Sequence, residues 1–202
     1  MKRANERAPT SRSRMRGLTL PELLATIAVA AIVLGIAVPS FRELFVQNRL
    51  TTRINHLVLD LNFARSEAVK RGGPQVVLCK STDDGASCST AADGIWETGW
   101  IVFVDDGDGV LEVGEKKLRV RLPLPAGFTL RASSGFVDKV IYRSTGVAAK
   151  TGQFTLCAGN DRTRARTVII NALGRIYQGQ DTDNNRIPEN EENHDITTCT
   201  PP

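Results

Sequence analysis

The order of apolar and polar residues divides the 202-residue chain into an apolar segment, a second helical segment and a region of short strands. Residues 18–38 form a largely apolar run in which Glu22 is the only charged residue. An α-helix rises about 1.5 Å per residue, so this run would be about 30 Å long, the thickness of the hydrocarbon core of a membrane. The pattern therefore predicts a membrane-spanning helix.

The helical pattern continues beyond this run. Between Phe41 and Arg71 apolar residues recur at steps of three and four, which is typical of an amphipathic helix. These positions are Phe41, Leu44, Phe45, Leu50, Ile54, Leu57, Leu61, Ala64 and Ala68. The sequence Gly72-Gly73-Pro74 predicts the end of the helix. We therefore expect one helix from about Thr19 to Arg71, about 80 Å long, with a kink or a local break at Pro39.

After Pro74 the chain changes to short runs rich in Val, Ile and Phe, separated by Gly, Asp, Asn and Pro. Such runs predict β-strands joined by turns. The predicted strands are 75–79, 101–104, 117–122, 128–131, 140–142, 154–157, 166–171 and 175–178. We expect them to form a largely antiparallel sheet of about six to eight strands, which makes the fold class α+β.

The charge is unevenly distributed. The formal net charge is +4, but residues 1–17 carry six basic side chains against one acidic, which leaves −1 for all the rest. Residues 179–202 carry six acidic side chains against one arginine. Positive charge before an apolar helix places residues 1–17 in the cytoplasm and the bulk of the chain on the other side of the membrane.

Composition excludes several kinds of site. Two histidines, His56 and His194, are too few for a histidine-based metalloenzyme, and no set of Ser, His and Asp suggests a hydrolase. The four cysteines, Cys79, Cys88, Cys157 and Cys199, predict two disulfides in an oxidising compartment, with three possible pairings. If Cys79 pairs with Cys88 and Cys157 with Cys199, the loop entropies correspond to about 3 and 4 kcal/mol.

The start of the chain closely resembles the class III signal of type IV pilins and type II secretion pseudopilins. The resemblance rests on the basic run, then Gly17-Leu-Thr-Leu-Pro-Glu22, then the apolar helix with Pro39 seventeen residues beyond Glu22. It implies that a prepilin peptidase cleaves between Gly17 and Leu18 and that Leu18 is then N-methylated. Cleavage before the apolar run would remove charge and retain the helix, unlike the cleavage of an ordinary signal peptide.

Glu22 and Pro39 are the predicted assembly residues. A carboxylate in the hydrocarbon core costs a few kcal/mol unless it is paired. The resemblance implies that Glu22 pairs with the amine that cleavage exposes on Leu18 of a neighbouring subunit. Processing would then create the charge that Glu22 needs.

The remainder resembles the GspH/FimT family of minor pilins and pseudopilins. The resemblance is carried by Asn62-Phe-Ala-Arg-Ser-Glu-Ala-Val-Lys-Arg71, by Trp96-x-x-Gly-Trp100-Ile-Val-Phe-Val-Asp105 and by Gly174-Arg175. The positions that match the family pattern are Ala64, Arg65, Ser66, Ala68, Trp100, Phe103 and Gly174. It implies a pilin-like fold, and we expect Trp100 and Phe103 to build that fold. It also implies a structural subunit, not an enzyme, that helps to initiate or cap a type IV pilus or a type II secretion pseudopilus.

The expected organisation follows from these observations. Residues 1–17 would be the leader, 18–39 the membrane-spanning half of the helix, 40–73 its amphipathic half, and 74–202 a β-rich periplasmic head with an acidic tail. The chain would be a single-pass protein of the bacterial inner membrane before it enters a filament. Its partners would be the prepilin peptidase and other subunits.

A basic region between residues 140 and 178 raises a second possibility, because it carries six basic side chains against Asp161. Some members of the FimT branch bind DNA in natural transformation through Gly-Arg-x-Arg, where this chain has Gly174-Arg175-Ile176-Tyr177. We favour a solvated basic strand. The alternative is a DNA site in which Arg164 and Arg166 share one face of a strand that pairs with 175–178. Its residues would be Arg162, Arg164, Arg166 and Arg175.

The acidic tail contains Asp181-x-Asp183-x-Asn185, with Glu189 and Glu192, which is the ligand spacing of an EF-hand loop. Arg186 stands where that loop has Gly. The spacing leaves open a calcium site formed by Asp181, Asp183, Asn185 and Glu192, and no other cofactor is expected. Asp105-Asp-Gly-Asp-Gly109 is interpreted as a turn between strands.

Overall fold

The computed structural model describes residues 19–197 and Cys199. One helix, α1, runs without interruption from Leu20 to Arg71, which confirms the single helix predicted from the sequence. Of the two possibilities predicted at Pro39, a kink or a local break, the continuous helix excludes the break. The chain divides into two compact units between Glu43 and Leu44, within α1. Gly72, with φ of 69°, ends the helix in the left-handed conformation that glycine adopts most easily.

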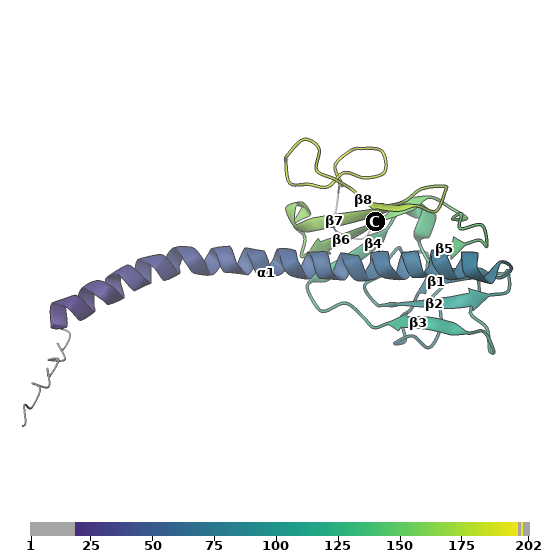
Figure 1. Ribbon diagram of the computed structural model, residues 1–202, viewed down its shortest axis with the longest axis horizontal. Coiled ribbons are helices and arrows are strands. Elements are labelled where there is room, and N and C mark those ends of the chain that lie inside the picture. Colours follow the sequence, from purple (N-terminus) through teal and green to yellow (C-terminus); the bar gives the residue numbers. More distant parts are fainter. Residues whose placement is uncertain (1–18, 198, 200–202) are drawn as a thin grey trace, which may run out of the picture. The chain divides into compact units, whose positions relative to one another are not determined.

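The strands form two antiparallel sheets (Figure 1). The first has the order β3-β2-β1-β5 and consists of β1 Gln75–Lys80, β2 Trp100–Asp105, β3 Lys117–Arg121 and β5 Lys139–Tyr142. The second has the order β4-β6-β7-β8 and consists of β4 Phe128–Ala132, β6 Gly152–Ala158, β7 Ala165–Ile170 and β8 Ile176–Gln178. Two short 3-10 helices, Ser134–Phe136 and Arg162–Arg164, interrupt the connections.

Both sheets share one core with the second half of α1. The helix contributes the stripe Leu50, Ile54, Leu57, Leu61, Ala64 and Ala68, all buried. Alternate residues of the strands face the same core, among them Val76, Leu78, Phe154, Leu156 and Val168. Because side chains alternate along a strand, the neighbours Val77, Cys79 and Phe103 face the other side, where they form a second cluster.

A disulfide lies on the outer side of each sheet. Cys79–Cys88 joins β1 to the loop that follows it, and Cys157–Cys199 joins β6 to the C-terminal segment. The second disulfide packs with Ala165, Ile187 and Ile196 in a third buried cluster. These two covers explain why β1, β2, β6 and β7 are buried on both faces and consist of nearly continuous apolar runs.

The head differs from the sequence prediction in one respect: its strands belong to two sheets instead of one. The separation arises at β4, which pairs with β6, whereas the following strand, β5, returns to pair with β1. A short apolar run specifies that a strand forms and which residues face inward, but it does not specify the partner strand.

Candidate assembly site

The first part of α1 exposes an apolar surface. Its large apolar side chains between Leu20 and Val38 are each at least 46% exposed. They are Leu20, Leu23, Leu24, Ile27, Val29, Ile32, Val33, Leu34, Ile36 and Val38. An 18-residue window of α1 has a mean hydropathy of 2.4, so the helix is long and apolar enough to cross a membrane. Such a surface requires an apolar environment that the head core does not supply.

Glu22 lies in the first turn of α1 and is exposed. Its Oε2 lies 3.5 Å from the backbone N–H of Thr19, the residue before the helix. A carboxylate in the first turn also interacts favourably with the helix dipole. No ion pair of the described residues includes Glu22, and its pairing with Leu18 of a neighbouring subunit stays a prediction.

The second part of α1 contains a buried charge, Asp60, that the sequence analysis missed. Asp60 is fully buried in the same stripe as Leu57 and Leu61. Its carboxylate accepts hydrogen bonds from Arg121 Nε at 2.6 Å, Arg119 Nη1 at 2.8 Å and Trp100 Nε1 at 3.0 Å. Asp60 therefore links α1 to β2 and β3.

Burial raises the pKa of Asp60, but the hydrogen bonds from Arg121, Arg119 and Trp100 outweigh burial and hold the pKa below its ordinary value. The side chain is therefore charged at neutral pH. A signal for this site was present in the sequence, because an aspartate stands three residues after Leu57 and four before Ala64, on an otherwise apolar stripe.

Two residues of the family pattern meet beside the end of α1. Arg65 donates from Nε to the carbonyl of Gly146 at 2.9 Å and from Nη2 to the carbonyl of Leu173 at 3.1 Å. Gly174 has φ of 70°, and a Cβ there would lie 2.2 Å from the Gly146 carbonyl oxygen. Arg65 and Gly174 thus hold two loops of the head against each other and against the helix.

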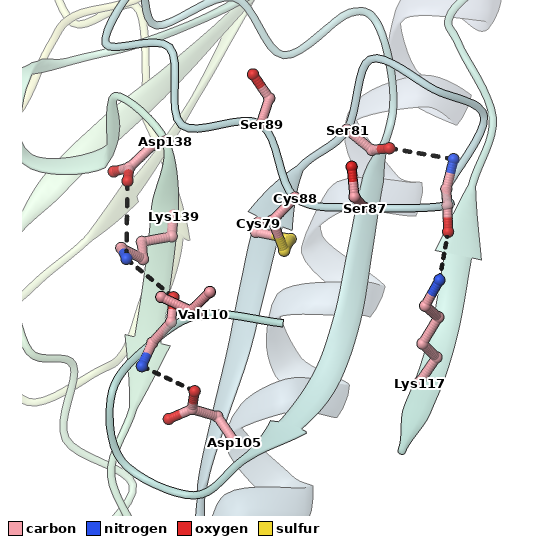
Figure 2. The surroundings of a disulfide bond; sticks show 12 residues. Cys79, Ser81, Ser87, Cys88, Ser89, Asp105, Val110, Lys117, Asp138 and Lys139 are labelled. Carbon is pink, nitrogen blue, oxygen red and sulfur yellow. Dashed lines mark hydrogen bonds and ion pairs between the residues drawn. A yellow bond between two sulfur atoms is a disulfide. The ribbon is translucent and has the colours of Figure 1, made fainter. Parts of the chain in front are cut away.

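Figure 2 shows the surroundings of the Cys79–Cys88 disulfide. Within the loop it closes, Asp83 accepts hydrogen bonds from Ser81 and Ser87, and these hold its pKa well below the ordinary value. Lys117 on β3 donates to the carbonyl of Gly85 at 2.9 Å. The loop is therefore fastened to the first sheet by the disulfide at Cys88 and by Lys117 at Gly85, which makes it a structural cover with no free thiol.

The four arginines of the alternative DNA site do not form one group. Arg164 belongs to the 3-10 helix Arg162–Arg164 and not to a strand, and its Nε lies 3.7 Å from Asp161. Arg166 on β7 donates to Gln47 and to the Ala165 carbonyl. Arg162 donates to the Ile196 carbonyl at 3.3 Å.

Arg175 lies at the other end of β7, where its backbone N–H bonds to Asn171. β8 pairs only with Val168 to Ile170. A strand rises about 3.3 Å per residue, and Arg175 lies beside Asn171. Arg166 and Arg175 are therefore about 17 Å apart along the strand direction. The shared strand face expected for Arg164 and Arg166 beside 175–178 is not formed, because Arg164 lies before β7 and β8 ends short of Arg166.

The acidic tail brings together some of its predicted ligands. One oxygen each of Asp181, Asp183 and Glu189 lies within 4.8 Å of the others. Asn185 donates from its side chain to Asp183 at 2.9 Å. Glu192 does not join this group, because its carboxylate points to His194 at 3.7 Å, and Glu189 provides the third carboxylate instead.

The Asp105 to Gly109 segment forms the turn expected from its sequence. Asp105 ends β2, and its carboxylate accepts from the backbone N–H groups of Gly107 at 2.9 Å and Gly109 at 2.8 Å.

A protein-family comparison matches residues 53–174 to the family described as "Type II transport protein GspH". The match covers more than half of the chain. The chain belongs to the GspH family. Residues 12–38 match a second model, the prokaryotic N-terminal methylation motif. Together these matches confirm the prepilin signal and the GspH/FimT resemblance read from the sequence.

One solved structure supports a pilin-like fold for this GspH-family chain. The type IV minor pilin FimU of Pseudomonas aeruginosa matches in one crystal form with a TM-score of 0.51 and 22% identity, covering 66% of this chain and 90% of FimU. A second crystal form gives a TM-score of 0.49 and 20% identity, covering 65% and 93%. No curated protein matches the chain.

The family pattern maps mostly onto the GspH-type core. Trp100 and Phe103 are buried in two different clusters, as expected for residues that build the fold. Gly17 and Leu18, the predicted cleavage site, lie outside the described residues. The chain thus combines a GspH-family head with an N-terminal methylation motif that overlaps a helix long and apolar enough to cross a membrane.

Proposed function

We propose that this GspH-family chain is a minor pilin or pseudopilin that helps to initiate or cap a type IV pilus or a type II secretion pseudopilus. The observation that carries the proposal is the composition of α1. One half presents an exposed apolar surface with a single carboxylate, and the other half is the central helix of a disulfide-linked head.

The proposal gives the exposed half two successive environments. Before assembly, the inner membrane covers it, with the basic residues 1–17 in the cytoplasm and the head in the periplasm. After a prepilin peptidase removes the leader, the same surface packs against the helices of neighbouring subunits in the filament. Both environments are apolar, so transfer from one to the other exposes no large apolar surface to water.

Glu22 supports the idea that processing and assembly are coupled. Within a bundle of apolar helices an unpaired carboxylate costs a few kcal/mol. The N-terminal amine that cleavage exposes on Leu18 of a neighbouring subunit can supply the opposite charge. A leader that remains attached would leave Glu22 without this partner and keep the subunit in the membrane.

The experiment is substitution of the residue before the predicted cleavage site. We expect Gly17→Trp to block processing, so that the chain keeps its full mass and is absent from sheared filaments. Ala8→Trp adds the same bulk inside the leader, far from the scissile bond, and should be processed normally. If the Gly17→Trp chain is processed and assembled like the wild type, the proposal is wrong.

DNA binding is the second candidate function, favoured by one observation. Arg175 and Tyr177 are both exposed, and they are two residues apart at the edge strand β8, where a base could stack on Tyr177 while Arg175 contacts a phosphate. The test is a gel shift with the full chain in detergent. Arg175→Gln should lower both the affinity and its salt dependence, whereas Arg162→Gln should not; equal affinity for all three chains would reject this candidate.

A further inference from the structure

The C-terminal segment forms a closed loop against the second sheet between Gln180 and Glu189. The N–H of Glu189 donates to the carbonyl of Gln180 at 3.0 Å, which closes the loop. The Glu189 carbonyl in turn accepts from the hydroxyl of Thr167 on β7 at 3.0 Å. The loop is therefore fixed at its base.

Three carboxylates converge in this loop. Asp181 and Asp183 approach from its exposed side, and Glu189 approaches from its buried side, with only 5% of its surface exposed. Among the residues that the structure describes, no lysine or arginine forms an ion pair with any of the three. Among the described residues the nearest positive charges are therefore not in contact with these carboxylates, although Arg166 and Arg186 line a cavity together with Asp181.

Glu189 has a second, independent peculiarity. Its Oε1 accepts hydrogen bonds from the backbone N–H and the hydroxyl of Thr182, and these hold the pKa of Glu189 below its ordinary value. Its Oε2 is buried and has no hydrogen-bond partner. A buried carboxylate oxygen without a partner is unfavourable, and an ion is one of the groups that can satisfy it.

We propose that Asp181, Asp183 and Glu189 bind a divalent cation, with Ca²⁺ as the ion that fits best. Carboxylate oxygens suit Ca²⁺, which accepts six to eight oxygen ligands in variable geometry. Mg²⁺ requires a more rigid octahedral arrangement. Waters and backbone oxygens complete the coordination.

The backbone is compatible with this assignment. Arg186 occupies the position where an EF-hand loop has Gly, and it adopts φ of 70°, the left-handed conformation for which that loop uses Gly. Asn185 is held between the two sides of the loop, since its side chain donates to Asp183 at 2.9 Å and to Asp195 at 2.7 Å.

A second acidic cluster, Asp105, Asp106 and Asp108, provides an internal comparison. Its oxygens also lie within 4.8 Å of one another. However, the buried member, Asp105, already accepts from Gly107, Gly109 and the side chain of Gln75, so both of its oxygens have partners. This cluster gives no sign of a missing ligand and is the matched control.

Cation binding would stabilise the cover of the second sheet. Ile187 lies within the loop and Ile196 follows it, and both pack on the Cys157–Cys199 disulfide. The disulfide secures this segment at Cys199, and a cation would secure it again near Glu189. The segment from Asp181 to Ile196 would then stay against the second sheet in solutions that contain the ion.

The test is titration of the full chain in detergent, with its disulfides intact, after removal of metal by a chelator. Isothermal titration with CaCl₂ should show one saturable site, and Ca²⁺ should raise the Tm. Asp181→Asn with Asp183→Asn should weaken binding about tenfold or more and abolish the Tm shift. Asp106→Asn with Asp108→Asn should leave both unchanged.

Glu189→Gln gives a second, more local test. Glutamine can still accept the hydrogen bonds of Thr182 through its amide oxygen, but it lacks the charge, so Ca²⁺ binding should weaken while the fold is kept. Three results would overturn the proposal: no saturable binding by the wild-type chain, binding that survives the Asp181/Asp183 double substitution, or stronger binding of MgCl₂ than of CaCl₂.

Discussion

The two halves of α1 belong to one uninterrupted helix, yet they bury their apolar residues in opposite ways. Between Leu20 and Val38 the large apolar side chains are exposed, whereas the stripe from Leu50 to Ala68 is buried. The first half is apolar on all sides, and the described residues leave it exposed. The second half is apolar along one stripe, which its own sheets cover.

The acidic residues of the two halves also differ in their ion-pair partners. Asp60 is fully buried and finds its countercharges, Arg119 and Arg121, within the head. Glu22 makes no ion pair among the described residues. The comparison teaches that an acid on a helix stabilises the fold when its partner is in the same chain. For Glu22 the proposed partner is the amine of a neighbouring subunit, so the proposal assigns this carboxylate to assembly instead.

The largest expected effect comes from removing the same side chain in each half. Leu61→Ala removes a fully buried leucine and should lower the free energy of unfolding of the head by about 2–5 kcal/mol. Leu34→Ala, in the exposed half, should leave it unchanged. Urea unfolding in detergent, followed by fluorescence of the buried Trp96 and Trp100, measures both. Equal losses of unfolding free energy for Leu61→Ala and Leu34→Ala would contradict the division of α1 into a buried and an exposed half.

The buried charge should have the next largest effect. Asp60→Asn leaves Arg119 and Arg121 without a countercharge, and both are about one-third exposed and can be partly rehydrated. We therefore expect a loss of about 2–3 kcal/mol, below the range for fully buried pairs. Asp161→Asn is the control, because an asparagine can still cap the 3-10 helix at this exposed position.

The effect of Asp60 should depend on pH. Its folded pKa lies below the ordinary value of 3.8, so its contribution to stability is fully present above about pH 4 and is lost as the pH falls through the folded pKa. The difference between wild type and Asp60→Asn should be constant from pH 7 to pH 5 and should shrink below pH 4. If the difference in stability between wild type and Asp60→Asn grows below pH 4, the pKa of Asp60 is not lowered in the folded state.

A smaller effect is expected at the loops that Arg65 holds against the buried half of α1. Gly174→Ala meets both a positive φ and the Gly146 carbonyl oxygen, and should cost about 2 kcal/mol or more. Gly159 has nearly the same φ, 68°, but no atom within 4 Å of a Cβ, so Gly159→Ala should cost only about 1 kcal/mol. If urea unfolding shows equal losses of unfolding free energy for Gly174→Ala and Gly159→Ala, the contact with the Gly146 carbonyl oxygen does not contribute to the cost.

The smallest effect on head stability is expected at Glu22. Glu22→Gln should change the free energy of unfolding of the head by less than about 0.5 kcal/mol, because the residue lies in the exposed half. The amount of chain recovered in sheared filaments should nevertheless fall, whereas Thr26→Ala, one turn further on, should leave it unchanged. If Glu22→Gln is recovered in sheared filaments in the wild-type amount, assembly does not depend on this carboxylate.

Much of this fold could be predicted because it depends on local patterns. The helix limits follow from the apolar positions and from Gly72-Gly73-Pro74, and the strands fall where Val, Ile and Phe cluster. The partners of Asp60 could not be predicted in this way, since Arg119 and Arg121 are 59 and 61 residues away in the chain. The surroundings of Glu189 could not be predicted either, because its contact with Thr182 depends on the conformation of the loop. The strand face predicted for Arg164 and Arg166 beside 175–178 is wrong, because Arg164 lies in the 3-10 helix before β7 and β8 pairs only with Val168 to Ile170.

The sequence by itself determined the length of the helix, the apolar character of its first half, the prepilin signal and the number of disulfides. These properties depend on residues close together in the chain, where backbone propensity and side-chain polarity act directly. Only the tertiary structure decided that the strands form two sheets, which cysteines pair, where Asp60 finds its countercharge and which carboxylates converge in the tail. Each of these depends on contacts between distant segments, whose geometry exists only once the core has packed.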